Sequence, residues 1–350
     1  MTAPMLTEPP VRRGSDYAGL SRRIAEAGLL DRRPGSYVLR IVLTLGAFVA
    51  GWAGVVALGD SWAQLLLAVG MAVATTQVAF LGHDAGHRQM FRRRWPSELA
   101  GLVAGNLAVG LSYGWWVDKH NRHHANPNHA DSDPDVGAGA LVWTDEQARA
   151  TRGFGRWLAA RQAWFFFPML LLEGLALHVA SVRALVGRSP DGGWATPVRH
   201  RAVEAVLLVA HAVGFLGLLL AVMSPVKALL FVVVQQGLWG LYMGCAFAPN
   251  HKGMPMPTAG DDLDFLRKQV LTSRNVRGGR FVDAALGGLN YQIEHHLFPN
   301  MPRANLRRAQ PIVRAYCAQR GVGYAETGLV ESYRQALGHL HEVGRPLRDG

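Results

Sequence analysis

The chain reads Ala79-Phe80-Leu81-Gly82-His83-Asp84-Ala85-Gly86-His87 at the point where a long apolar segment gives way to closely spaced histidines. Two further clusters share this spacing, His120-Asn121-Arg122-His123-His124 and Gln292-Ile293-Glu294-His295-His296. In a helix, residues three and four apart project from one face, so each cluster would form a ridge of imidazoles. The clusters hold seven of only 14 histidines. This pattern predicts one shared metal site.

Four apolar blocks are close to the roughly 20 residues that a helix needs to span the hydrocarbon core of a bilayer. They comprise residues 37–58, 62–81, 205–223 and 228–247. Only a few polar residues join the first block to the second and the third to the fourth, so each pair predicts a hairpin that crosses and returns. We therefore expect an all-α integral membrane protein with four transmembrane helices.

Arginines flank these blocks on one side, with Arg32 and Arg33 before the first block and Arg92 and Arg93 after the second. The positive-inside rule then places both termini and the large polar regions in the cytoplasm. We expect a mushroom-shaped protein with a cytoplasmic, histidine-rich helical cap. Its expected parts are a cytoplasmic N-terminal segment (1–36), a transmembrane hairpin (37–82), a first part of the cap (83–202), a second hairpin (203–248) and a second part of the cap (249–350).

Two more apolar stretches, 99–116 and 165–179, complicate this topology. If either crossed the membrane, at least one histidine cluster would lie on the opposite side from the others, whereas a shared metal centre requires all three on one side. We therefore expect both stretches to be interfacial or re-entrant helices. The alternative is six spans with separated histidines. Glu173, in the second stretch, is costly in lipid, and we expect it to form a hydrogen bond with His178.

The composition narrows the class of protein. Only 17% of the 350 residues are charged, against about 25% in soluble domains. The formal net charge is +11, which in a membrane protein predicts contact with anionic lipid and an acidic partner. No nucleic-acid motif accompanies the arginines, so no nucleic-acid partner is expected. The two cysteines, Cys245 and Cys317, form no CxxC pair, which argues against a zinc–thiolate site and a disulfide scaffold.

Imidazole binds iron, copper, zinc and nickel, so the ligand type leaves the metal open. The sequence contains neither the HExxH motif of zinc proteases nor the Glu-x-x-His pairs of soluble di-iron carboxylate proteins. A nitrogen-rich site with more ligands than one tetrahedral ion needs indicates two metals. Beside a membrane, such a centre favours oxygen activation on a lipid chain. His251, just after the fourth block, is a candidate for a further ligand.

Three acidic residues lie inside or beside the clusters but off the ligand face. Asp84 and Glu294 are inside the first and third clusters, and Asp118 precedes the second. Carboxylates near a metal-bound histidine often accept a hydrogen bond from its second ring nitrogen and thereby orient the ring. We expect this role for Asp84, Asp118 and Glu294.

The second cluster lies in the run WWVDKHNRHHANP (115–127) and the third in NYQIEHHLFPNMPR (290–303). Together with the first cluster, these runs resemble the histidine boxes of the membrane fatty-acyl desaturase family. A glutamine at the start of the third box, here Gln292, resembles the front-end type. The most similar subgroup is the bacterial acyl-CoA or acyl-lipid desaturases without a fused cytochrome b5 domain.

The resemblance implies a multi-pass enzyme of the cell membrane that uses O2 to introduce a cis double bond into a fatty-acyl chain, carried by coenzyme A or by a phospholipid. It also implies a cytoplasmic di-iron centre. The implied iron ligands are His83, His87, His120, His123, His124, His251, Gln292, His295 and His296. Some relatives have an asparagine one turn before the additional histidine, where this chain has Phe247.

A bent, dry tunnel for the acyl chain belongs to the same implication. Candidate wall residues are Trp115, Trp116, Trp239, Tyr242 and Phe247, although packing at the membrane interface is an alternative explanation for these aromatic residues. Candidate contacts for a phosphate-bearing carrier are Arg88, Arg92, Lys119, Lys252 and Arg274, although ordinary positive-inside charge explains them too.

Each turnover of such an enzyme requires two external electrons, and the sequence contains no flavin or nicotinamide fingerprint. We therefore expect a separate electron donor, ferredoxin-type with its reductase, that docks on the basic cap. The first alternative function is a related di-iron lipid hydroxylase or ketolase, which shares the architecture. A histidine-rich metal transporter is more distant, because it should hold its ligands near mid-bilayer. A zinc-dependent membrane hydrolase would need a general base that is not evident.

Overall fold

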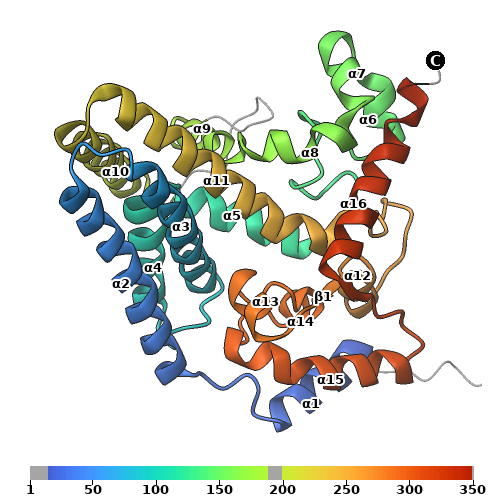
Figure 1. Ribbon diagram of the computed structural model, residues 1–350. Helices are drawn as coiled ribbons and strands as arrows, with labels where there is room; N and C mark the ends of the chain where they lie inside the picture. Colours follow the sequence, from blue (N-terminus) through green and yellow to red (C-terminus); the bar gives the residue numbers. More distant parts are fainter. Residues whose placement is uncertain (1–14, 188–198, 349–350) are drawn as a thin grey trace, which may run out of the picture.

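The structure is a computed structural model that describes residues 15–187 and 199–348 (Figure 1). Within these residues nearly all of the regular secondary structure is helical, and the only strands are the three-residue segments β1 (Asn275–Arg277) and β2 (Glu326–Gly328). The two strands pair in parallel. The predicted all-α class is therefore confirmed. Both chain termini and residues 1–14 of the predicted N-terminal segment lie outside the described residues.

Four of the described helices are long and apolar enough to cross a membrane, as predicted. They are α2 (Pro34–Leu58), α3 (Gln64–Gly86), α10 (Arg201–Val222) and α11 (Pro225–His251). Helices α2 and α11 begin with a proline, whose fixed φ suits the first helical turn. Helices α3 and α11 pack against each other, whereas few side chains of α2 and α10 are fully buried and much of their apolar surface is exposed. In a membrane, that exposed surface would face lipid.

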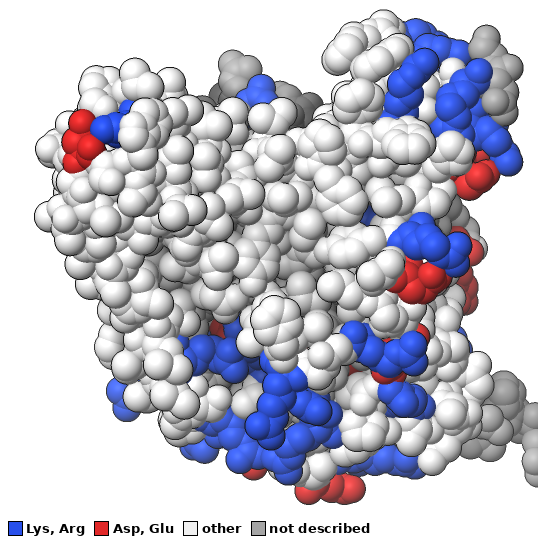
Figure 2. Space-filling view, viewed as in Figure 1, with Lys and Arg blue, Asp and Glu red and all other residues white. Residues whose placement is uncertain are grey.

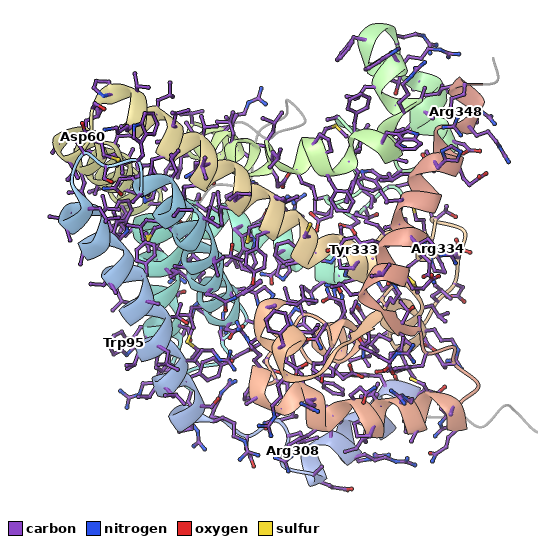
Figure 3. The ribbon with its side chains drawn as sticks, viewed as in Figure 1. Asp60, Trp95, Arg308, Tyr333, Arg334 and Arg348 are labelled. Carbon is purple, nitrogen blue, oxygen red and sulfur yellow. The ribbon has the colours of Figure 1, made fainter. Side chains whose placement is uncertain are left out.

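The tips of the two helical hairpins are tied together. Helix α2 ends at Gly59, where a φ of +56° favours glycine. The next residue, Asp60, accepts a hydrogen bond from the backbone nitrogen of Ser224 at 2.8 Å and pairs with Lys227 at 3.2 Å. Figure 3 shows Asp60 at the opposite end of the molecule from Arg308.

The stretch 99–116 is broken and does not form one interfacial helix. Helix α4 (Arg94–Leu102) continues into the π-helix η1 (Val103–Val109), which ends at Gly110 with a φ of +83°. A Cβ atom at this position would lie 2.5 Å from the His211 ring, so both the conformation and the space require glycine. Helix α5 (Tyr113–Ala125), which carries the second cluster, then starts anew.

A buried glutamate stabilises this break. Glu204, in the first turn of α10, accepts hydrogen bonds from Asn106 Nδ2 at 3.0 Å, Ser112 Oγ at 2.7 Å and the backbone nitrogen of Gly114 at 3.0 Å. Ser112 also caps α5 by accepting from the backbone nitrogen of Trp115 at 3.3 Å. One carboxylate thus fixes the end of η1, the following turn and the start of α5.

The stretch 165–179 is broken as well. Helices α8 (Gln162–Leu170) and α9 (Glu173–Leu185) meet at an angle of 71°. His178 Nδ1 lies 2.8 Å from the Gly110 carbonyl oxygen, and its Nε2 lies 3.1 Å from Gln236 Oε1. Both ring nitrogens are therefore engaged, and the predicted bond between His178 and Glu173 is wrong. Glu173 stands five residues earlier, on another face of α9, and lines the cavity described below.

Shorter elements form a layer at one end of the apolar helices (Figure 1). The centre of this layer is apolar and joins α1 to α12, α14 and α15 through side chains such as Leu20, Val270, Leu297 and Tyr316. Helix α16 packs against α8 and α11. The elements not yet given are α1 (Asp16–Glu26), α6 (Asp145–Ala150), α7 (Gly153–Ala159), α12 (Phe265–Leu271), α13 (Gly279–Ala285), α14 (Gln292–Leu297), α15 (Arg303–Gln319), α16 (Leu329–Val343) and the 3₁₀-helix η2 (Arg345–Leu347).

The apolar helices extend past the predicted ends of the hairpins, at residues 82 and 248. Helix α3 continues to Gly86 and α11 continues to His251. Histidines therefore occupy the last turns of two long apolar helices, where these meet the layer of shorter helices. The division into membrane and cytoplasmic parts stays a prediction.

Candidate metal centre

The first cluster lies at the end of α3, where His83 is in the last turn and His87 follows the helix. Their rings are 4.7 Å apart, and both side chains are buried. Helix α5 approaches this turn so closely that a Cβ atom on Gly86 would lie 2.7 Å from the Trp116 ring. The absence of a side chain at Gly86 thus lets the first two clusters meet.

The second and third clusters are both helical, as the spacing predicts. On α5, His120 and His124 are one turn apart, and their Nε2 atoms are 3.2 Å apart. Helix α14 has only six residues, all of them buried, and holds Gln292, His295 and His296. The last residue of α11, His251, is also buried and contributes an eighth imidazole.

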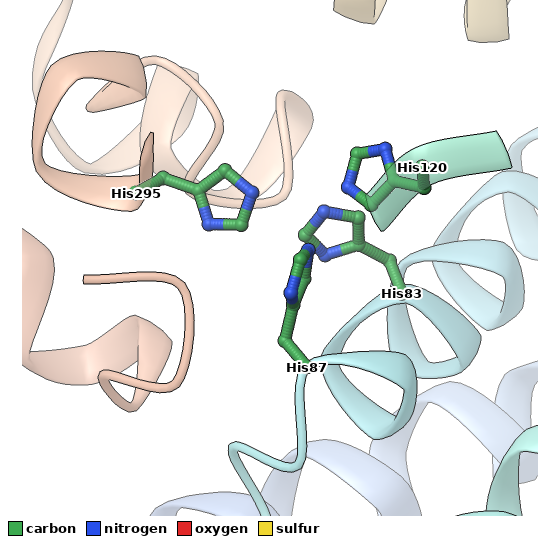
Figure 4. Close-up of side chains that lie close together, drawn as sticks. All are labelled: His83, His87, His120 and His295. Carbon is green, nitrogen blue, oxygen red and sulfur yellow. The ribbon is translucent and has the colours of Figure 1, made fainter. Parts of the chain in front are cut away.

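The imidazoles gather in two groups whose candidate ligand atoms lie within 4.8 Å of one another. The first group, shown in Figure 4, contains His83, His87, His120 and His295. The second contains His123, His251 and His296. His124 lies between them, with its ring 4.6 Å from that of His87 and 4.1 Å from that of His296. Four separate helices therefore supply the imidazoles of one centre.

Hydrogen bonds to the Nδ1 atoms indicate the tautomers of the second group. His123 Nδ1 lies 2.9 Å from an oxygen of Asp133, His251 Nδ1 lies 3.0 Å from the Thr272 carbonyl oxygen, and His296 Nδ1 lies 3.0 Å from Gln269 Oε1. Because these partners are acceptors, each Nδ1 carries the proton and each Nε2 presents a lone pair.

Two such lone pairs face each other, because the Nε2 atoms of His251 and His296 are 3.1 Å apart. Two unprotonated nitrogens at this distance form no hydrogen bond with each other, and a shared cation would satisfy both. In the first group, buried ring nitrogens of His83, His87 and His295 have no hydrogen-bond partner among the described residues. The donor set therefore fits metal binding in both groups.

Burial also favours the neutral form of the histidines. Loss of solvation lowers the pKa of His87, His120, His124, His295 and His296 well below the usual value, and neighbouring imidazoles lower it further. These rings are neutral at pH 7, and the neutral ring is the form that binds metals.

Gln292 reaches the second group through its amide. Its Nε2 lies 2.9 Å from His251 Nε2, and its Oε1 accepts from Asn250 Nδ2 at 3.3 Å. Asn250, which directly precedes His251 in sequence, is therefore the buried amide beside this histidine. It was missed by the sequence analysis. Phe247, one turn before His251, lines the cavity instead.

Of the three acidic residues expected to orient histidines, only Asp84 lies near a histidine ring nitrogen. Asp84 lies 3.4 Å from His83 Nδ1 and forms a buried ion pair with Arg303 at 2.8 Å. Glu294 accepts from Asn275 and Tyr324, both at 2.7 Å, and contacts no imidazole by hydrogen bonding. Burial raises the pKa of Glu294 to about 7.

Asp118 lies away from the histidines, because its carboxylate pairs with Arg122 at 3.2 Å on the outer face of α5. The carboxylate nearest to the second cluster belongs to Asp133, in the loop after α5, 2.9 Å from His123 Nδ1. Asp133 also accepts from the backbone nitrogens of Asn128 at 2.6 Å and Asp135 at 2.9 Å. The sequence signal was the Asp133-Pro134-Asp135 turn ten residues after His123.

A cavity of about 300 Å³ adjoins the second group. Among the candidate tunnel residues, Trp115, Trp116 and Phe247 line it. Trp239 is instead packed against Gly174 and His178, and Tyr242 donates to the Ala285 carbonyl oxygen at 2.6 Å. A smaller, mostly apolar cavity beside His83 shares the lining residues Leu111, Trp116, Met243 and Phe247.

Only some of the residues expected to contact the carrier line the larger cavity. Lys119 and Lys252 line the larger cavity, whereas Arg88 and Arg92 line neither of the two. The Arg274 side chain is buried and donates to backbone carbonyl oxygens, among them that of Pro249 at 2.6 Å. Arg274 therefore stabilises the end of α11 and is not free to hold a carrier.

Comparison with known proteins identifies the family of this chain. The family described as "Fatty acid desaturase" matches residues 60–328. An acyl-lipid (9-3)-desaturase of Physcomitrium patens is 31% identical over 315 residues, which cover 88% of this chain and 58% of that protein. The Delta(5) fatty acid desaturase fat-4 of Caenorhabditis elegans is 30% identical over 317 residues, 88% and 69% of the two chains.

The Delta(6)-fatty-acid desaturase fat-3 of the same nematode is 28% identical over 344 residues, 95% of this chain and 75% of that protein. This chain thus spans between about half and three quarters of the length of these relatives. The family match covers most of the chain and includes all three histidine clusters. The protein belongs to the fatty acid desaturase family.

Proposed function

We propose that this protein is a di-iron, O2-dependent fatty-acyl desaturase that introduces a cis double bond near the carboxyl end of an acyl chain. The observation that carries the proposal is the pair of imidazole groups beside a cavity with a largely apolar lining. The relatives support the reaction and its position, since the names of the two nematode enzymes give Delta(5) and Delta(6), positions that are counted from the carboxyl end.

One iron would be held by the first group and the other by the second, with His124 between them and Gln292 beside the second. When bound, iron supplies the oxidant that removes two hydrogens from the acyl chain. O2, two electrons and two protons are consumed, and two waters form along with the double bond. Asp133, Gln269 and the Thr272 carbonyl hold the imidazoles in the tautomer that binds metal.

The remaining work of the chain is to position the acyl chain and exclude water. Leu111, Trp115 and Phe247 line the cavity beside the histidines and offer apolar surface to methylene groups. Exclusion of water protects a strong oxidant from side reactions. The carrier is either a phospholipid, joined to the acyl chain by an ester, or coenzyme A, joined by a thioester.

We further propose a multi-pass position in the cell membrane, with the metal centre on the cytoplasmic side. Figure 2 shows lysines and arginines gathered around α1 and α15 and again near α7 and the end of α16, with few charges along the apolar helices. Arg307, Arg308 and Arg314 of α15 are exposed there. This charge suits the cytoplasmic face and an acidic, ferredoxin-type electron donor with its reductase.

Expression in a host that lacks the product tests the proposal. Fatty-acid methyl esters would be analysed by gas chromatography–mass spectrometry with double-bond location, with a ferredoxin and its reductase co-expressed. The intact chain should yield one new cis-unsaturated acid, and His123→Ala should yield none while still inserting in the membrane. Hydroxylated or oxo products would assign the protein to the related lipid oxygenases, and activity in His123→Ala would contradict the metal centre.

A further inference from the structure

The larger cavity has a polar region that the reaction itself does not require. Most of its lining is apolar, as expected for an acyl chain. Four charged side chains nevertheless take part in the lining. They are Lys119 on α5, Asp135 in the loop after α5, Glu173 on α9 and Lys252 at the end of α11. Charged groups in an otherwise apolar cavity are costly unless they pair or bind something.

Lys119 is anchored next to the candidate iron ligands. It directly precedes His120 on α5, and its ammonium group pairs with Asp135. The other carboxylate oxygen of Asp135 lies 3.4 Å from His123 Nδ1. The Lys119 ammonium is thus separated from a ligand of the second group by a single carboxylate.

Lys252 is anchored in the same place from the opposite side. It directly follows His251, donates to the Asp135 carbonyl oxygen at 3.0 Å, and holds its ammonium 4.0 Å from the centre of the Trp143 ring. A cation over the face of a tryptophan is attracted by the ring and restricted in its orientation. Asp135 therefore joins both lysines at one end of the cavity.

Both ammonium groups retain unused donors. Each has three N–H groups, and each has only one hydrogen-bond acceptor among the described residues. About a third of the Lys119 side chain (32%) is accessible where it lines the cavity. The free donors therefore meet water or a bound ligand.

We propose that Lys119 and Lys252 bind the carbonyl oxygen of the ester or thioester that joins the acyl chain to its carrier. Two carboxylates, Asp135 and Glu173, accompany the two lysines, so the region lacks the excess positive charge that would favour a free carboxylate. A neutral carbonyl oxygen accepts the free donors without that excess. This inference rests on the proposed function and identifies what fixes the position of the double bond.

The location of the two lysines determines where the double bond would form. Because both adjoin iron ligands in sequence, a carbonyl held there leaves only a few methylene groups between itself and the metal centre. The rest of the acyl chain extends along apolar lining residues such as Leu170, Leu177 and Met243. The enzyme would therefore count carbons from the carboxyl end.

The first test compares ligands that differ only in the carbonyl group. Full-length, iron-loaded protein would be titrated with stearoyl-coenzyme A and its S-octadecyl thioether, and separately with a diacyl phosphatidylcholine and its dialkyl ether. The wild-type protein should bind the carbonyl form of its own carrier about ten-fold more tightly or better, in line with a hydrogen bond to a charged donor. The carrier whose carbonyl form binds more tightly, coenzyme A or phosphatidylcholine, is the one that this enzyme uses. Equal binding within both pairs would overturn the proposal without any mutation.

The second test uses Lys119→Met and Lys252→Met, each with measured iron content. Either variant should bind the carbonyl and carbonyl-free ligands within about two-fold of each other and should give a mixture of double-bond positions. Lys252→Arg should keep most of the carbonyl preference. Lys268→Met is the matched control, because Lys268 donates to Asn126 at 3.2 Å and does not line the cavity; it should behave as wild type.

An iron-loaded Lys→Met variant that keeps both the carbonyl preference and a single product would refute the carbonyl site while leaving the desaturase proposal intact. Absence of any double bond with the wild-type chain would instead contradict the desaturase proposal. The two failures are therefore distinguishable.

Discussion

At the scale of single residues, Asp133 shows how one carboxylate can organise a metal ligand. It lies 2.9 Å and 3.0 Å from His123 Nδ1 through its two oxygens and is itself held by two backbone nitrogens. A carboxylate in this position fixes the ring and raises the basicity of the opposite nitrogen. His123 therefore depends on a residue outside its own helix.

Asp133→Asn should lower the iron content and the desaturase activity by about 10- to 100-fold, because the amide keeps the shape but loses the charge that orients His123. Iron per protein and product formation would be measured on the same preparation. Asp118→Asn is the matched control, since Asp118 pairs with a partly exposed arginine. Wild-type iron content and activity in Asp133→Asn would contradict this role.

Sequence alone predicted the residues that form the clusters better than those that support them. The clusters are visible because helical spacing places His120, His123 and His124 on one ridge. The partners Asp133 and Gln269 lie in separate segments, and only folding brings them to the imidazoles. Asp118 was nearer in sequence, but its position on the outer face of α5 directs it to Arg122.

At the scale of elements, hydropathy and length predicted the four long helices, because apolar composition along some 20 residues is a local property. The breaks within 99–116 and 165–179 were not predictable in the same way. The break in 99–116 depends on contacts between distant segments, above all on the close approach of His211 to Gly110 and on the hydrogen bonds of Glu204 at the start of α10. The hydropathy of a segment does not record such contacts.

Glu204→Leu should destabilise the protein by about 3 kcal/mol or more, because it would leave the buried donors of Asn106 and Ser112 and the half-buried backbone nitrogen of Gly114 without their acceptor. The thermal unfolding midpoint in detergent and the iron content should both fall, since α5 carries three imidazoles. Glu98→Leu removes a carboxylate that pairs with Arg94 and Arg199 at the surface and should change stability by less than about 1 kcal/mol. Equal effects of the two substitutions would show that Glu204 has no special role.

At the scale of the whole molecule, the candidate metal centre joins the long apolar helices to the layer of shorter helices. Its imidazoles come from α3, α5, α11 and α14, and no single pair of helices holds a complete group. Without metal, these buried imidazoles must stay neutral to remain in place. The stability of the metal-free protein should therefore depend on pH.

Metal-free protein should lose stability as the pH falls below about 6.5, the ordinary histidine value. His87, His120, His124, His295 and His296 have lowered pKa values in the folded state, so the unfolded chain binds more protons there. Their full contribution is present above pH 6.5, and each pH unit below costs up to about 1.4 kcal/mol per histidine.

The thermal unfolding midpoint of chelator-treated protein between pH 8 and pH 5 would measure this dependence. Replacing two of the five histidines, in His87→Asn/His295→Asn, should make the decline shallower. A midpoint that stays constant over the range would show that these rings are not held neutral by the fold.

The origin of the imidazoles in separate helices also sets an order of events during synthesis. More than 200 residues separate His83 from His296 along the chain. At about 5–20 residues per second, a ribosome needs roughly ten to forty seconds to add them. Throughout that interval the hairpin bearing His83 and His87 is in place with an incomplete coordination shell. Neither imidazole group can therefore be complete before α14 is made, and a nascent chain interrupted before α14 lacks a candidate metal ligand in each group.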